Sequence, residues 1–160
     1  MRITILLLIV ALTAPLLGQT DTQAPPQRDN ATVLLEALGV FSGVGVYMSH
    51  AAVGSLVDAH EGGIYDREMT LGVIGEYIAL NQSVVDYLTY LTSVETLDPD
   101  DVKVMSKLRV AYMLINEQLM AYAAYLHTNS QSELDTYAAK RDEAWGVIAD
   151  IYGFNQEGEQ

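Results

Sequence analysis

The sequence predicts an all-α protein: an antiparallel up-down-up-down four-helix bundle preceded by a signal peptide and a short disordered linker. Beyond residue 30, apolar residues recur at helical spacings of three and four, and no run alternates as a strand does. Four such stretches of about 20 to 30 residues are separated by short polar turns, which make consecutive helices antiparallel neighbours. The 160 residues include no cysteine, so an apolar core has to stabilise an exported chain.

Residues 1–18 have the layout of a secretory signal peptide. Arg2 forms a short positive region, residues 3–12 form an apolar region, and Pro15 breaks the helix. The apolar segment of about 15 residues is shorter than the roughly 20 that a spanning helix needs. We therefore expect export, to the periplasm or out of the cell; retention of the segment as an uncleaved anchor is the alternative. Residues 19–30 are polar and are expected to form a flexible linker.

The uncharged stretch from Ala37 to Val57 dominates the bundle domain, which covers residues 31–160. A helix that is apolar nearly all round is buried in a protein core or in a bilayer. His50 interrupts the stretch, and three amphipathic helices follow that need an apolar partner. These features favour a core helix wrapped by the other three, and a membrane-spanning helix is the alternative.

The four helices are expected over about residues 31–59, 66–94, 99–127 and 132–152. Gly62-Gly63 ends the first helix and Gly153 the last, because glycine tolerates the left-handed conformation that follows many helices. The residues expected to point inward are Leu71, Ile74, Ile78, Val85 and Leu88 on the second helix, Met105, Leu108, Tyr112, Ile115, Leu119, Tyr122 and Leu126 on the third, and Leu134, Ala138, Trp145, Ile148 and Tyr152 on the fourth.

Charge and motifs exclude several classes of function. The net charge of −13 argues against nucleic acid and anionic membrane surfaces as partners. Membrane contact is expected only if the signal segment is retained as an anchor or if the first helix spans a membrane. Without cysteine there is no thiolate metal site, iron–sulfur cluster or covalent c-type haem. The chain also lacks Gly-x-Ser-x-Gly, Glu-x-x-His and a phosphate-binding loop, so we expect neither an enzyme nor a cofactor.

The first helix is rich in glycine, and each helical glycine loses roughly 1 kcal/mol relative to alanine. The chain also has ten tyrosines, most of them on the other helices. We expect bulky tyrosines to pack against the positions of the first helix where glycine leaves no side chain. A ligand cavity beside it is the alternative.

A polar layer is expected near mid-bundle. Asn81 and Arg141 occupy inward positions on the second and fourth helices, at the height of Gly45 and close to Tyr112. A buried arginine has to be paired or hydrogen-bonded, and no acid points inward at this height. The layer either fixes the register of the helices or binds a small anionic ligand such as a carboxylate. With Trp145, these four residues form the candidate ligand site.

Asp58, His60, Glu61 and His127 are expected to gather at one end of the bundle, as a candidate Zn²⁺ or Cu²⁺ site. The sequence thus predicts an exported acidic bundle that acts as a non-enzymatic small-molecule-binding or protein-interaction module. A metal- or cofactor-binding bundle that uses the His60/His127 cluster is the alternative. The oligomeric state stays open.

Overall fold

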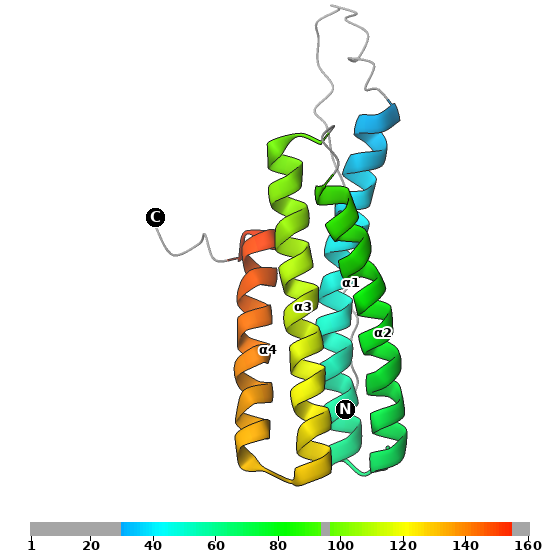
Figure 1. Ribbon diagram of the computed structural model, residues 1–160, viewed down its shortest axis with the longest axis vertical. Helices are drawn as coiled ribbons and strands as arrows, with labels where there is room; N and C mark the ends of the chain where they lie inside the picture. Colours follow the sequence, from blue (N-terminus) through cyan, green and yellow to red (C-terminus); the bar gives the residue numbers. More distant parts are fainter. Residues whose placement is uncertain (1–29, 94–96, 155–160) are drawn as a thin grey trace, which may run out of the picture.

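The computed structural model describes residues 30–93 and 97–154, which form an antiparallel four-helix bundle (Figure 1). The helices are α1 (Asn30–Glu61), α2 (Arg67–Thr92), α3 (Pro99–Thr128) and α4 (Gln131–Tyr152). The predicted fold class is confirmed, and each helix begins and ends within one turn of its expected bounds. The expected signal peptide and all but the last residue of the expected linker lie outside the described residues.

Local turn chemistry sets the ends of the helices. The carboxylates of Asp66 and Asp98 accept backbone N–H groups in the first turns of α2 and α3, at 2.8 and 2.9 Å. Pro99 follows Asp98 at the start of α3, where its missing N–H is not needed. Asn129 and Gly153, with φ of 52° and 73°, end α3 and α4 in the left-handed conformation.

α3 is the central helix of the bundle and packs along both α2 and α4. Every inward position predicted for α3 is buried, and so are Ile74, Val85 and Leu88 of α2. The other two residues predicted for α2, Leu71 and Ile78, are half-buried and pack against this core. A clear apolar stripe with polar residues opposite it identifies the buried side of a helix. The predictions for α2 and α3 are therefore confirmed.

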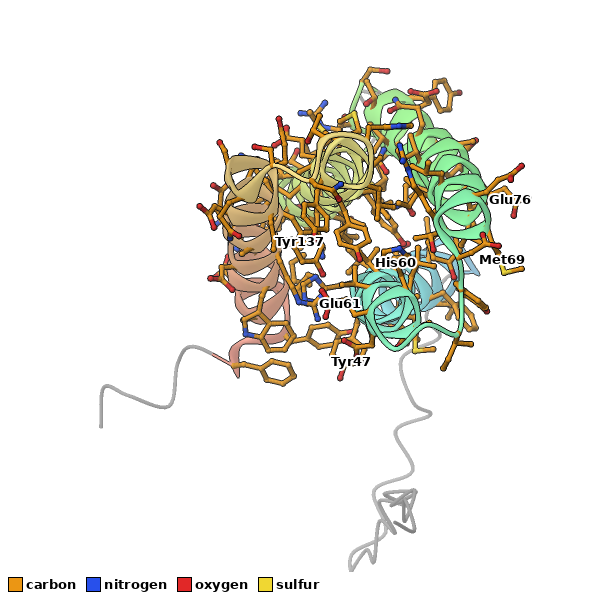
Figure 2. All side chains as sticks on the ribbon, turned by 90° about the horizontal axis from the view of Figure 1, so that it is seen from below. Tyr47, His60, Glu61, Met69, Glu76 and Tyr137 are labelled. Carbon is orange, nitrogen blue, oxygen red and sulfur yellow. The ribbon has the colours of Figure 1, made fainter. Side chains whose placement is uncertain are left out.

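The prediction that α1 is buried on all sides is wrong. Only 33% of its most apolar stretch is buried, and Phe41, Val40 and Met48 are 74%, 66% and 60% exposed. Seen along the bundle, α1 lies at one side, across the interior from α3 (Figure 2). Because α3 already packs against both α2 and α4, only one side of α1 is covered. Within residues 30–93 and 97–154, α1 is also the one helix whose length and composition would suit a membrane span.

The predicted inward face of α4 is only partly confirmed. Ile148 is buried as predicted and Leu134 is half-buried, whereas Ala138 lies at the surface and Trp145 and Tyr152 are 42% and 38% exposed. At two of these positions the preceding residue, Tyr137 or Ala144, is buried instead. Tryptophan is far more apolar than its neighbour Ala144, so the sequence pattern favoured the wrong one of two adjacent positions. The small Ala144 side chain occupies the core position, where it is fully buried.

Gln118 is a polar residue inside the core of α3. It is 0% exposed, and neither of its side-chain polar atoms has a hydrogen-bond partner among the described residues. An unpartnered buried amide destabilises the folded state. We expect Gln118→Met, which keeps the unbranched shape, to raise the free energy of unfolding by about 1 kcal/mol in urea titrations.

The matched control for this substitution is Gln82→Met. Gln82 is exposed and donates to Asp86 at 2.9 Å, so its replacement is expected to change stability by less than about 0.5 kcal/mol. A loss of stability in Gln118→Met would contradict the prediction and show that the amide is hydrogen-bonded, for example to a buried water.

Candidate functional site

A cleft of about 340 Å³ opens between α1 and α4 and is called the α1–α4 cleft below. Its walls are aromatic. The ring of Trp145 stacks on His50 with centroids 5.8 Å apart and lies 6.3 Å from the ring of Tyr47. Figure 2 shows Tyr47 on the side of α1 that is turned toward α4. The residues that line the cleft are Tyr47, His50, Ala51, Arg141, Asp142 and Trp145.

His50 forms the inner part of this cleft and is only 6% exposed. Its burial, and second the charge of Arg141, lower the pKa of the imidazole from 6.5 to about 4. His50 is therefore neutral at pH 7. Its Nδ1 atom is buried and has no hydrogen-bond partner within the described part of the chain. Sequence reasoning did not assign His50 to the ligand site; the available signal was a single histidine inside an uncharged helical run.

The side chain of Arg141 on α4 extends to α1. Its Nη1 donates to the backbone carbonyl of His50 at 3.4 Å, a long hydrogen bond. The guanidinium lies against Gly54, where an added Cβ would be 2.7 Å from Nη2. A glycine in α1 thus makes room for the guanidinium. Within residues 30–93 and 97–154, no carboxylate forms an ion pair with Arg141, so no described acid neutralises its charge.

Two other residues of the predicted ligand site, Gly45 and Tyr112, pack against each other. A Cβ at position 45 would be 2.9 Å from the Tyr112 hydroxyl. Tyr112 is buried, and this burial raises its pKa. Its hydroxyl occupies the space that the glycine leaves, so this part of the predicted site is not open to a ligand.

Asn81 does not join Arg141 in one polar layer. Asn81 is buried and lines a different cleft, between α1 and α2, together with Ser49 and Tyr77. Asn81 and Arg141 lie at similar distances along their helices from the turns, but height along the bundle does not fix the direction of a side chain. The two residues face opposite flanks of α1, and the expected single layer is therefore divided.

The structure also separates the metal ligands expected from the sequence. His60 Nδ1 lies 3.0 Å from the Tyr122 hydroxyl in the core, whereas His127 Nδ1 lies 3.0 Å from Nη2 of Arg67 at the surface. Among the described residues, no group of three or more histidines and acids could hold a metal ion. A metal-binding bundle therefore gains no support from the arrangement of Asp58, His60, Glu61 and His127.

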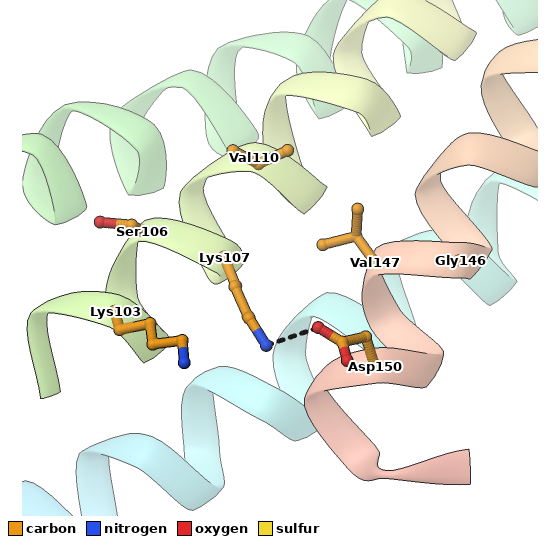
Figure 3. A pocket seen from close by; sticks show the side chains of 7 residues that line it. All are labelled: Lys103, Ser106, Lys107, Val110, Gly146, Val147 and Asp150. Carbon is orange, nitrogen blue, oxygen red and sulfur yellow. Dashed lines mark hydrogen bonds and ion pairs between the residues drawn. The ribbon is translucent and has the colours of Figure 1, made fainter. Parts of the chain in front are cut away.

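A larger surface groove of about 620 Å³ lies between α3 and α4 (Figure 3). Lys103 and Lys107 line it from α3, and Lys107 donates to a carboxylate oxygen of Asp150 on α4. This pairing neutralises one of the two cations. The groove is shallow and holds none of the buried unpartnered polar atoms, so the α1–α4 cleft is the better candidate for a binding site.

Comparison with protein-family models, with curated proteins and with solved structures finds no match. Fold alone does not carry function, since helical bundles host many unrelated activities. Evidence on function therefore comes from the residues of the α1–α4 cleft.

Proposed function

We propose that the protein is an exported, non-enzymatic binding module whose α1–α4 cleft takes a small organic carboxylate. The secretory layout of residues 1–18 supports export, and the lack of catalytic motifs in the sequence supports a non-enzymatic role. Arg141 carries the proposal: it is a guanidinium without a carboxylate partner among the described residues, and it lines the same cleft as His50, whose Nδ1 is buried and unpartnered.

The chemistry of the cleft suits a monocarboxylate with an apolar body. A guanidinium binds a carboxylate through two parallel hydrogen bonds. The partly exposed rings of Trp145 and Tyr47 offer apolar surface to the rest of the ligand. Neutral His50 can add a hydrogen bond without adding charge. Asp142 lies exposed at the rim and disfavours a second negative charge there.

Trp145 is the only tryptophan of the chain, so its fluorescence reports on this cleft alone. We expect titration of the purified protein with benzoate to give a saturable change in emission. Benzamide has the same ring without the charge and should give no saturable change over the same concentration range. No response to benzoate or phenylacetate, or an equal affinity for benzamide, would contradict the proposal.

Arg141→Gln should weaken benzoate binding by about tenfold or more, because a charge-assisted hydrogen bond is worth about 1.5–3 kcal/mol. Lys107→Gln is the matched control, since it also removes one positive charge but lies in the separate groove between α3 and α4. Equal weakening in both variants would show that the response follows net charge and not the guanidinium in the cleft.

A further inference from the structure

Two opposite charges line the α1–α4 cleft, and a simple carboxylate would account for only one of them. Arg141 and Asp142 both border the cleft. Among the described residues, neither side chain forms an ion pair, with the other or with a third residue. A bound monocarboxylate would pair with the guanidinium and leave the carboxylate of Asp142 without a counter-charge. A ligand that carries both charges complements both side chains.

The net charge of the chain favours the same kind of ligand. A protein with a net charge of −13 repels a simple carboxylate. A zwitterion has no net charge, so this repulsion does not oppose its binding. Its carboxylate can still pair with Arg141 through two parallel hydrogen bonds.

Aromatic rings offer the cationic end of such a ligand a surface. Tyr47 extends from α1 toward α4 (Figure 2), and its ring centroid lies 6.3 Å from that of Trp145. Tyr152 lies 6.3 Å from Tyr47 and stacks on Phe154 at 5.2 Å. Phe154 in turn lies 6.3 Å from Trp145, and these four partly exposed rings are called the aromatic wall below. The faces of aromatic rings attract cations, and tryptophan attracts them most strongly.

The polar groups of the cleft favour an ammonium without N–H groups. A primary ammonium has three donors, and each of them needs an acceptor. Among the described residues that line the cleft, Asp142 carries the one carboxylate, and it lies exposed at the rim. A trimethylammonium group has no donors and presents methyl groups to the rings, so it needs no acceptor inside the cleft.

The separation of the guanidinium from the rings sets the length of the ligand. The guanidinium of Arg141 lies against Gly54 and donates to the backbone carbonyl of His50. The rings of Tyr47 and Trp145 lie about one helical turn nearer the start of α1, which is roughly 5 Å. A chain of three methylene groups between the carboxylate and the ammonium spans this distance.

We infer that the α1–α4 cleft binds a betaine, a zwitterion with a carboxylate at one end and a trimethylammonium group at the other. The carboxylate pairs with Arg141, and the trimethylammonium group lies against the aromatic wall beside Asp142. This inference rests on the proposed carboxylate site and adds the positive end of the ligand.

Two carboxylates of the same shape test this inference through the fluorescence of Trp145. One is the betaine 4-(trimethylammonio)butanoate, and the other is 5,5-dimethylhexanoate, which has carbon in place of the ammonium nitrogen. We expect the betaine to bind at least about fivefold more tightly, because the rings and Asp142 attract its cation. An equal affinity for the two, or binding of benzoate without binding of the betaine, would overturn the inference and leave the carboxylate site in place. A lack of response to all three compounds would overturn both.

Two variants locate the cation within the cleft. Tyr47→Leu should reduce the preference for the betaine by about threefold, and Asp142→Asn by about twofold at low salt. The matched controls are Tyr87→Leu and Asp86→Asn, which make the same changes at exposed positions on α2 and should leave the preference unchanged. A preference that is unchanged in both cleft variants would place the ammonium outside the cleft and overturn the inference.

A third compound tests the methyl groups of the ammonium. 4-Aminobutanoate has the same chain and the same two charges, but its ammonium carries three N–H groups. We expect it to bind more weakly than the betaine, because the aromatic wall cannot replace the water that these donors lose. An equal or higher affinity for 4-aminobutanoate would overturn the betaine as the ligand.

Discussion

Replacing Gly45 with leucine is expected to lower the free energy of unfolding by about 2 kcal/mol, because the new side chain overlaps the core. A Cβ at this position would already lie 2.9 Å from the Tyr112 hydroxyl, and leucine adds three further carbon atoms. Tyr112 is buried on α3, so its ring cannot move aside without disturbing the core. Leucine gains only about 0.8 kcal/mol over glycine in helix propensity, so overlap dominates. Urea titration measures the change.

Gly75→Ala is the matched control. Gly75 is an exposed residue in the middle of α2, and an added Cβ there would have no neighbour within 4 Å. This substitution should raise stability by about 1 kcal/mol through helix propensity alone. If Gly45→Leu were tolerated as well as Gly75→Ala, the space beside Gly45 would be open, and a ligand cavity would explain the glycines of α1 better than packing against tyrosine.

The sequence was sufficient to predict α2 and α3 because each has an apolar stripe, a polar opposite side and a recognisable cap. Asp66 and Asp98 cap these helices as turn chemistry requires. α1 lacks this contrast: Val46 and Val53 are buried, while Phe41 is exposed, and nothing in an uncharged run separates them. Which side of such a helix is covered depends on the packing of the other helices, and local hydropathy does not report it.

The candidate site was predicted only partly correctly, and the reason is related. Height along a bundle follows from counting residues, but rotation about a helix axis changes by about 100° with every residue. Arg141 and Trp145 do line one cleft, whereas Asn81 faces another. His50 was not assigned to the site because a histidine in an apolar run gives no direction. Only the position of α4 shows that the His50 ring stacks on Trp145 and lines the same cleft as Arg141.

Lowering the pH from 7 to 4 is expected to destabilise the wild type by up to about 3 kcal/mol through His50 alone. Burial holds the pKa of His50 at about 4 in the folded protein, against 6.5 for the ordinary side chain. The unfolded chain therefore takes up this proton from about pH 6.5 downward, while the folded protein does not until about pH 4. The stabilisation that neutral His50 contributes is therefore fully present above pH 6.5, decreases as the pH falls, and is lost below about pH 4.

His50→Phe isolates this contribution from that of the 21 acidic residues, which titrate in an overlapping range. Phenylalanine keeps a ring beside Trp145 but binds no proton. The wild type should lose more free energy of unfolding than the variant as the pH falls from 7 to 4.

A difference between wild type and variant that stays constant with pH would mean that His50 has the same pKa in the folded and unfolded states. The imidazole would then be charged below pH 6.5, and the cleft would hold two cations in mildly acidic surroundings. Carboxylate binding would in that case strengthen on acidification, whereas a neutral His50 leaves Arg141 to carry the affinity alone.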